Sequence, residues 1–245
     1  MKIYKADLHI HTVLSPCGDL SMSPVNIISE AVRKGIEIIG ITDHNSTRHC
    51  KLVSRLAAAH GIFTMMGAEV TTREEVHCLA FFENTDTLDL FQEYLDEHLP
   101  DIRNIPEFFG DQVQVDEKEN IIYTEERMLA NALDISLEEI ESFVHCNDGI
   151  FIPAHIDRQK NAIYSQLGFI PAGLKAEALE VSWRNSRNSF AEGRSDLAGY
   201  NLITNSDAHL PESIGRAFTE YWLAAPSFKE MKLAFLKKGE RRIER

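Results

Sequence analysis

The chain has 245 residues, of which 44% are hydrophobic and 26% are charged, and its formal net charge is -13. This composition is ordinary for a soluble globular protein, and α/β barrels of this length commonly form one domain, so we expect a single domain over 1–245. No apolar run approaches the ~20 residues of a membrane span, and the acidic balance disfavours a broad duplex-binding surface, which requires clustered Lys and Arg. Because the start "MKIYKADLHI" lacks the apolar core of a secretory signal, we expect a cytoplasmic protein, and the four scattered cysteines fit reduced thiols.

The first third of the chain alternates short apolar runs with helical patterns, which is typical of βα units. The segment "DLHIHT" at 7–12 predicts the first strand. A helix follows over 23–35, with Ser23 as N-cap, Pro24 at its first position and Gly35 at its end. We then expect a strand at 36–42, a helix at 46–61, and strands at 63–71 and 76–82.

The segment 84–149 is less regular, and we expect an α-rich insertion on one face of a barrel because it is short and poor in β-branched core residues. As such an insertion it would cap the rim of the barrel on that face and set the size of what can bind there. Predicted within it are helices at 87–99, 125–133 and 136–146, the last with a Ser136–Glu139 capping box, and a polar hairpin at 112–123. The βα pattern resumes with strands at 149–155, 178–182 and 201–209 and ends on a helix at 227–239.

Two histidines share one face of the first predicted strand. Residues i and i+2 of a strand point the same way, so His9 and His11 project side by side. Two adjacent imidazoles are costly unless something binds both, and neutral imidazole is the commonest metal ligand. A metal site is therefore the first functional hypothesis.

Further His, Asp and Glu residues occur at or near the ends of the other predicted strands. In parallel βα folds the carboxyl ends of the strands form one rim, where sites are built. Imidazole and carboxylate without thiolate suit Zn, Mn or Fe, and the candidates outnumber the ligands of one ion. We therefore expect two or more divalent ions, with a carboxylate such as Glu69 placed to bridge them. The candidates are His9, His11, Asp43, His44, Glu69, His77, His155, Asp207 and His209.

Five short motifs together resemble one known family. The stretches "DLHIHT", "ITDHN", "GAEV", "PAHID" and "NSDAH" look like the successive motifs of the PHP (polymerase and histidinol phosphatase) metal-dependent phosphoesterases. The resemblance implies a distorted (β/α)7 barrel with a trinuclear site at its rim. It assigns His9, His11, Glu69 and Asp207 to a first ion, Glu69, His77 and His155 to a second, and His44 and His209 to a third.

The resemblance also implies one more ligand to the third ion, from the loop "LSPCGDLSMSP". Asp19 is favoured because a hard carboxylate matches the other ligands, and Cys17 is the alternative. Asp43 is expected to orient an imidazole rather than to bind an ion. Arg158, three residues after His155, resembles the arginine with which the family binds the phosphate.

Other polar and aromatic residues near the motifs are ambiguous. Arg184 and Arg216 are weaker candidates for the phosphate contact, since surface ion pairs explain them equally well. Trp183 and Phe190 could line a pocket for a base or ring, although packing explains them as well. The histidines expected to be structural are His49, His60 and His98.

Together with the family resemblance, several ions at one rim imply hydrolysis of a phosphate ester by a metal-activated hydroxide. The leading prediction is a phosphatase acting on a phosphate monoester of a small metabolite or nucleotide. No membrane partner is expected, and extended nucleic acid is disfavoured as a partner but not excluded. One alternative is a phosphodiesterase or nuclease acting on nucleic-acid ends or nucleotide bisphosphates. Such an enzyme would need Lys and Arg around the site, whereas the one dense basic cluster, "KKGERRIER", is C-terminal. The other is a non-catalytic metal-binding scaffold, which the nearly full ligand set disfavours. An amidohydrolase barrel also opens with an HxH strand, but "TDHN" and "SDAH" favour the phosphoesterase.

Overall fold

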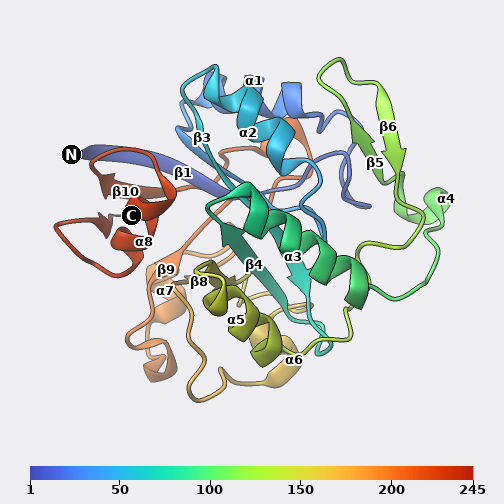
Figure 1. Cartoon of the computed structure of the whole chain (residues 1–245). Helices are drawn as coiled ribbons and strands as arrows, with labels where there is room; N and C mark the ends of the chain where they lie inside the picture. The colour runs from blue at the N-terminus through green and yellow to red at the C-terminus, as the bar shows by residue number, and fades with distance from the viewer. Residues whose placement is uncertain (245) are drawn as a thin grey trace.

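The computed structural model describes residues 1–244 as a curled mixed sheet with helices on its outer face (Figure 1). No helix within these residues is long and apolar enough to cross a membrane. The strands are β1 (Lys2–Ile10), β2 (Ile38–Ile41), β3 (Phe63–Thr71), β4 (His77–Phe82), β5 (Val113–Val115), β6 (Ile121–Thr124), β7 (Ile150–Pro153), β8 (Leu179–Glu180), β9 (Leu202–Ile203), β10 (Thr219–Leu223) and β11 (Arg242–Ile243). The α-helices are α1 (Pro24–Lys34), α2 (Cys50–Ala58), α3 (Thr85–His98), α4 (Pro106–Phe109), α5 (Leu137–Cys146), α6 (Ile163–Leu167), α7 (Arg187–Ala191) and α8 (Phe228–Phe235), with 3-10 turns at Ser195–Leu197 and Pro211–Ser213.

The strands form a barrel whose sheet is interrupted. Two backbone hydrogen bonds outside the strand ladders link its parts. One sheet has the order β11-β10-β1-β2-β3-β4-β7, and β8 and β9 form a separate parallel pair. The Ile156 N–H donates to the Glu180 carbonyl over 2.8 Å, joining the segment after β7 to β8. The Ala208 N–H donates to the His9 carbonyl over 3.2 Å, joining the segment after β9 to β1. The predicted α/β barrel class is therefore confirmed, in a distorted form.

Strand β4 departs from the simple βα pattern, because it runs antiparallel to both β3 and β7. The connection between β3 and β4 is a short turn in which the Thr72 N–H donates to the Val76 carbonyl over 3.0 Å. A parallel crossover needs a dozen or more residues, so this connection can only make a hairpin. As a result β4 begins at the edge where β3 ends, and His77 pairs with Thr71.

Local signals in the sequence set the ends of two helices as predicted. The Ser23 side chain caps the start of α1, where Pro24 is the first residue, and Gly35 ends the helix in a left-handed conformation with φ 65°. At the start of α5, the Ser136 and Glu139 side chains each bind the other residue's backbone N–H, which is the predicted capping box.

The helix predicted at 125–133 is wrong, because this segment is irregular backbone. Carbonyl groups that a helix would bond internally accept from distant side chains instead. The Gln112 amide donates to the carbonyls of Glu125 and Arg127 over 2.9 and 2.7 Å, and the Asn45 amide donates to the Leu129 carbonyl over 2.7 Å. These tertiary bonds replace the i to i-4 pattern of a helix.

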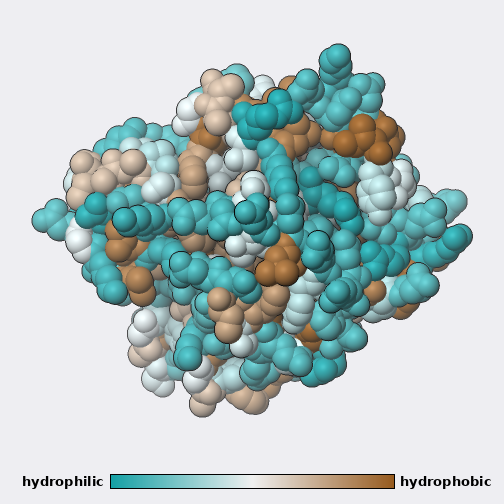
Figure 2. Space-filling view, in the orientation of Figure 1, coloured by the Kyte–Doolittle hydropathy of each residue, from teal (hydrophilic) through white to brown (hydrophobic). Residues whose placement is uncertain are grey.

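The segment 84–149 has two structural parts. Helix α3 packs against β4, and α5 packs against β4 and β7, so these helices belong to the outer layer of the barrel (Figure 1). The hairpin β5–β6 instead lies against the loop after β1, where Val113 and Val115 pack on Val13. Ile121 and Ile122 of β6 are 64% and 59% exposed. Figure 2 shows an apolar patch at the upper right, in the region where Figure 1 places β6. That the segment caps the rim stays a prediction.

Strand β10 was not predicted, yet it flanks the strand that carries the first motif. It pairs antiparallel with β1, from Lys2 opposite Leu223 to Ala6 opposite Thr219. Helix α8 packs on β10, and its Phe228 and Met231 join the apolar cluster formed by strand residues such as Leu8. β10 and α8 therefore cover the sheet near the N-terminal end of β1, while the C-terminal end of β1 carries the polar motif.

Candidate metal centre

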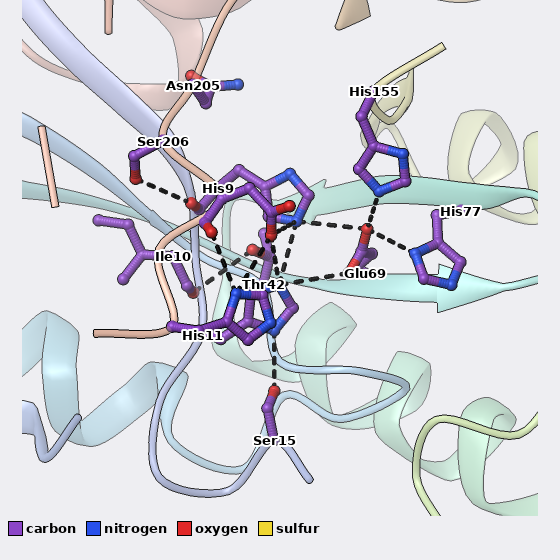
Figure 3. Close-up of polar contacts among 12 residues, drawn as sticks. His9, Ile10, His11, Ser15, Thr42, Glu69, His77, His155, Asn205 and Ser206 are labelled. Atoms are coloured by element: carbon purple, nitrogen blue, oxygen red, sulfur yellow. Dashed lines mark hydrogen bonds and ion pairs between the residues drawn. The ribbon is translucent and has the colours of Figure 1, made fainter. Parts of the chain in front are cut away.

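The two histidines of the first motif face each other at the end of β1 (Figure 3). The Nε2 atoms of His9 and His11 are 3.1 Å apart, and the ring centroids are 5.1 Å apart. Both side chains are fully buried. The side-by-side arrangement predicted from the strand is what the structure shows.

Hydrogen bonds to the outer nitrogens leave the inner nitrogens free to bind a metal. His9 Nδ1 lies 3.0 Å from a carboxylate oxygen of Glu180, and His209 Nδ1 lies 3.1 Å from the Asp207 carbonyl. Because these oxygens only accept, each Nδ1 carries a proton, and the neutral imidazole keeps its lone pair on Nε2. Burial opposes the charged form of His9, but the carboxylates of Glu180, Glu69 and Asp207 raise its pKa, so an ion bound at Nε2 would displace a proton. His11 Nδ1 likewise lies 2.9 Å from Ser15 Oγ. This outer-shell arrangement is the usual one for metal-binding histidines.

The Glu69 carboxylate lies at the middle of the cluster and is almost fully buried. Its two oxygens face different sets of imidazoles, as a bridging carboxylate would. The nearest nitrogens are His77 Nδ1 at 2.9 Å, His155 Nε2 at 3.0 Å and His9 Nε2 at 3.3 Å from Oε1, and His44 Nδ1 at 3.1 Å and His11 Nε2 at 3.3 Å from Oε2. Burial alone would raise the pKa of Glu69, but the surrounding imidazoles hold it well below its usual value, so the carboxylate is ionised.

Asp207 supplies a second carboxylate on the other side of the two facing imidazoles. Its Oδ1 lies 3.4 Å from His9 Nε2 and 3.3 Å from His11 Nε2, and its other oxygen pairs with Arg158. Asp207 and His155 have positive φ angles of 49° and 27°. Non-glycine residues rarely adopt this conformation, and such local strain gathers at functional sites.

The donor set fits divalent ions. Burial lowers the pKa of His44, His77 and His209, that of His209 to about 4, so these imidazoles stay neutral and able to bind a metal. His44 Nδ1 is buried and makes no hydrogen bond within residues 1–244. Three overlapping groups have ligand atoms within 4.8 Å of one another: His9, His11 and Glu69; His11, His44 and His209; and His44, Glu69 and His77.

The structure does not bring Asp19 into this cluster. Its backbone N–H donates to the His209 carbonyl over 3.1 Å, but its exposed carboxylate accepts from the N–H and the hydroxyl of Ser21 over 2.8 and 2.5 Å. Cys17 is exposed, and the surrounding protein atoms, together with the Glu69 and Asp207 carboxylates, raise the pKa of its thiol, which favours its protonated form. Both residues remain predictions for the third ion.

Asp43 acts on the loop after β1 rather than directly on a ligand imidazole. Its carboxylate accepts from the Thr12 N–H over 2.6 Å, the Thr12 hydroxyl over 2.7 Å and the Ser15 hydroxyl over 2.9 Å. Because Ser15 Oγ also contacts His11 Nδ1, one hydroxyl connects Asp43 to His11. Its role in catalysis stays a prediction.

Glu180 was not predicted, and His49, expected to be structural, makes two buried hydrogen bonds. Glu180 is buried in β8 and binds His9, the His155 N–H and the Asn205 amide. An acid inside the apolar stretch "ALEVS" was the only signal for it. His49 is buried, with Nδ1 2.6 Å from Thr12 Oγ1, and its Nε2 accepts from the Val115 N–H over 2.9 Å. It therefore connects the hairpin β5–β6 to the loop that carries the metal centre.

Two cavities open beside the cluster and share Arg158 and Arg184. The larger has a volume of about 630 Å³ and is bordered by His77 and His155; the smaller, of about 240 Å³, is bordered by Asp207. No described residue of 84–149 lines either one. A substrate could reach the cluster from both sides of Arg158.

Comparison with known proteins gives relatives for most of the chain. Over 90 residues it is 38% identical to the uncharacterised protein MJ1587 of Methanocaldococcus jannaschii, a match covering 34% of this chain and 52% of that protein. It is 26% identical to the uncharacterised protein YqxK of Bacillus subtilis over 99% of this chain and 64% of that protein. The chain thus spans less than two thirds of the curated relatives it matches.

Solved structures share the fold at lower identity. The lesion-specific endonuclease EndoQ of Pyrococcus furiosus matches with a TM-score of 0.77 and 20% identity, over 99% of this chain and 58% of that chain. A Bifidobacterium adolescentis protein assigned to the metal-dependent phosphoesterases matches with a TM-score of 0.59 and 18% identity, over 87% of this chain and 91% of that chain. Among family models, that of the PHP domain matches residues 7–156 and that of a PHP-associated region matches residues 185–239. The chain therefore belongs to the PHP domain family.

Proposed function

We propose that this chain hydrolyses a phosphate monoester of a small metabolite or nucleotide with the help of two to three divalent ions. The observation that carries the proposal is the Glu69 carboxylate, whose two oxygens face separate sets of imidazoles while Arg158 borders the same cluster. One carboxylate shared by two ions is a recurring element of hydrolytic metal sites.

Within this proposal each residue has a defined task. His9, His11, Glu69 and Asp207 hold a first ion, Glu69, His77 and His155 a second, and His44 and His209 a third, with Asp19 or Cys17 completing it. Bound divalent ions supply Lewis acidity and lower the pKa of water. Glu180 and Asp43 keep His9 and His11 in the orientation that directs Nε2 inward.

Arg158 is proposed to bind the non-bridging oxygens of the phosphate. Its guanidinium pairs with Asp207 at the border of both cavities, so it can donate to a phosphate without moving far from the cluster. Hydrogen bonds from guanidinium to phosphate oxygens are charge-assisted and often bidentate, which both positions the group and offsets its charge.

A second candidate is cleavage of a phosphodiester in nucleic acid. It is favoured by the likeness to EndoQ, one structure of which holds a 27-mer duplex with an abasic lesion at the active site. The net charge of -13 weighs against a long polyanion as substrate. The role of a non-catalytic scaffold is less well supported, because the proposed donor atoms converge in the structure.

The test combines metal analysis with activity. Freshly purified protein is analysed by plasma mass spectrometry and assayed for phosphate release from nucleotides and sugar phosphates. Two to three equivalents of Mn, Fe or Zn, with release abolished in Glu69→Gln but kept in the surface control Glu37→Gln, is the expected result. Cleavage of an oligonucleotide without phosphate release would move the assignment to a nuclease, and protein without metal would refute the metal centre.

A further inference from the structure

The smaller cavity beside the metal centre is rich in arginine. Its volume is about 240 Å³, and Asp207 and His209 of the proposed centre form part of its wall. The other walls come from the segments after β7, β8 and β9. They include the three arginines Arg158, Arg184 and Arg216 together with Trp183.

Two of these arginines share one aromatic support and lack acidic partners. The Cζ atoms of Arg184 and Arg216 lie 4.8 and 4.6 Å from the ring centroid of Trp183. In the part of the chain that the structure describes, neither makes an ion pair with Asp or Glu, whereas Arg158 pairs with Asp207. This is notable in a chain with 38 acidic and 25 basic residues, where acidic partners are plentiful.

Bringing two guanidiniums to one ring has an electrostatic cost, because like charges repel. Contacts with the indole offset part of this cost. An anion bound between the two groups would offset the rest, and the planar guanidinium fork matches the oxygens of a phosphate. The pair therefore has the chemistry of an anion subsite.

The position of the pair distinguishes it from the site of hydrolysis. Under the proposed function the scissile phosphate lies at the metal centre and is held by Arg158. Arg184 and Arg216 line the same cavity but, unlike Arg158, make no ion pair with a proposed ligand among the described residues, so they remain available for another group. A cavity of about 240 Å³ has room for a group of phosphate size but not for a folded nucleic acid.

We propose that Arg184 and Arg216, carried by Trp183, form a subsite for a second phosphate group of the substrate. This inference rests on the proposed function and narrows it: the substrate is a small bisphosphate, of which one phosphate is hydrolysed and the other is bound by the arginine pair. The second phosphate is an anchor and takes no part in bond cleavage.

The experiment compares glycerol bisphosphate with glycerol monophosphate on the metal-loaded protein. Wild type is expected to show a kcat/KM at least about tenfold higher for the bisphosphate, as one additional charge-assisted contact allows. Arg184→Ala with Arg216→Ala should remove this preference and leave the monophosphate rate within about twofold. Arg194→Ala is the matched control, since this guanidinium also lies over aromatic rings, 4.3 Å from the Phe190 centroid, but outside the cavity.

Several results would overturn the inference. One is equal kcat/KM for the two substrates in wild type, and another is a preference that survives the double substitution. If wild type hydrolyses neither substrate, calorimetric binding decides the inference: glycerol bisphosphate must bind more tightly than inorganic phosphate in wild type but not in the double variant. The proposed function itself fails only if the nucleotides and sugar phosphates tested above also release no phosphate. Arginine-dependent cleavage of a single-stranded oligonucleotide, without preference for the bisphosphate, would refute a small substrate.

Discussion

Glu180 offers the sharpest test of how the metal centre is held, because both of its carboxylate oxygens are fully used. Oε1 accepts from His9 Nδ1 at 3.1 Å and from the Asn205 amide at 2.8 Å. Oε2 accepts from His9 Nδ1 at 3.0 Å and from the His155 N–H at 2.9 Å. The substitution Glu180→Gln keeps the volume but turns one acceptor into a donor that must face another donor.

Two separate losses are expected from Glu180→Gln. One buried donor is left without a partner, which lowers the free energy of unfolding of the metal-free protein by about 1–3 kcal/mol. His9 also loses the charged acceptor that fixes its Nδ1 proton, and changes at such outer-shell positions typically weaken metal binding by about 10- to 100-fold. The second loss corresponds to roughly 1.4–2.7 kcal/mol.

The assay separates the two losses. Urea unfolding in the presence of a chelator measures the first, and calorimetric metal titration measures the second. Glu177→Gln is the matched control, because its carboxylate accepts from the Phe151 N–H over 2.8 Å without contacting a proposed ligand. Wild-type metal affinity in Glu180→Gln, with a loss of stability like that of the control, would refute the orienting role.

Three further outcomes are expected. Chelation should lower the thermal midpoint, because a ligand held only by the folded state stabilises it by about 2.7 kcal/mol at a concentration of ~100 Kd; an unchanged midpoint in scanning calorimetry would contradict this. His49→Ala leaves the Val115 N–H without an acceptor, so it should lower the free energy of unfolding by about 1–3 kcal/mol and speed amide exchange at Val115. Unaltered exchange would show that the hairpin does not depend on His49. Gly40→Ala would place a Cβ 2.3 Å from the Leu8 carbonyl oxygen, so urea unfolding should show a loss of at least about 1–3 kcal/mol, and wild-type stability would disprove the close approach.

Features governed by local chemistry could be predicted from the sequence. Ser23, Gly35 and the Ser136–Glu139 box act on their own helix ends, so the sequence alone locates them. The barrel class followed in the same way, from the alternation of short strands and helices.

Features that depend on distant partners could not be predicted. In the sequence Glu180 is a single acid in an apolar run. Only the fold brings it to His9, which is 171 residues away along the chain. The segment 125–133 has a helical pattern, but Gln112 and Asn45 compete for its carbonyl groups. The exposed side chain of Asp19, bonded to Ser21, likewise depends on loop geometry that no spacing encodes.

The hairpin β3–β4 also bears on the order in which the metal centre can assemble during folding. Glu69 and His77 are only eight residues apart and lie on adjacent strands, so their half of the centre can form early at a small cost in chain entropy. The other half requires β9 to reach β1, as in the bond from the Ser206 N–H to Asp7 across 199 residues. We therefore expect metal to bind with high affinity only after the two ends of the chain have met, which makes ion uptake a reporter of the final folding step.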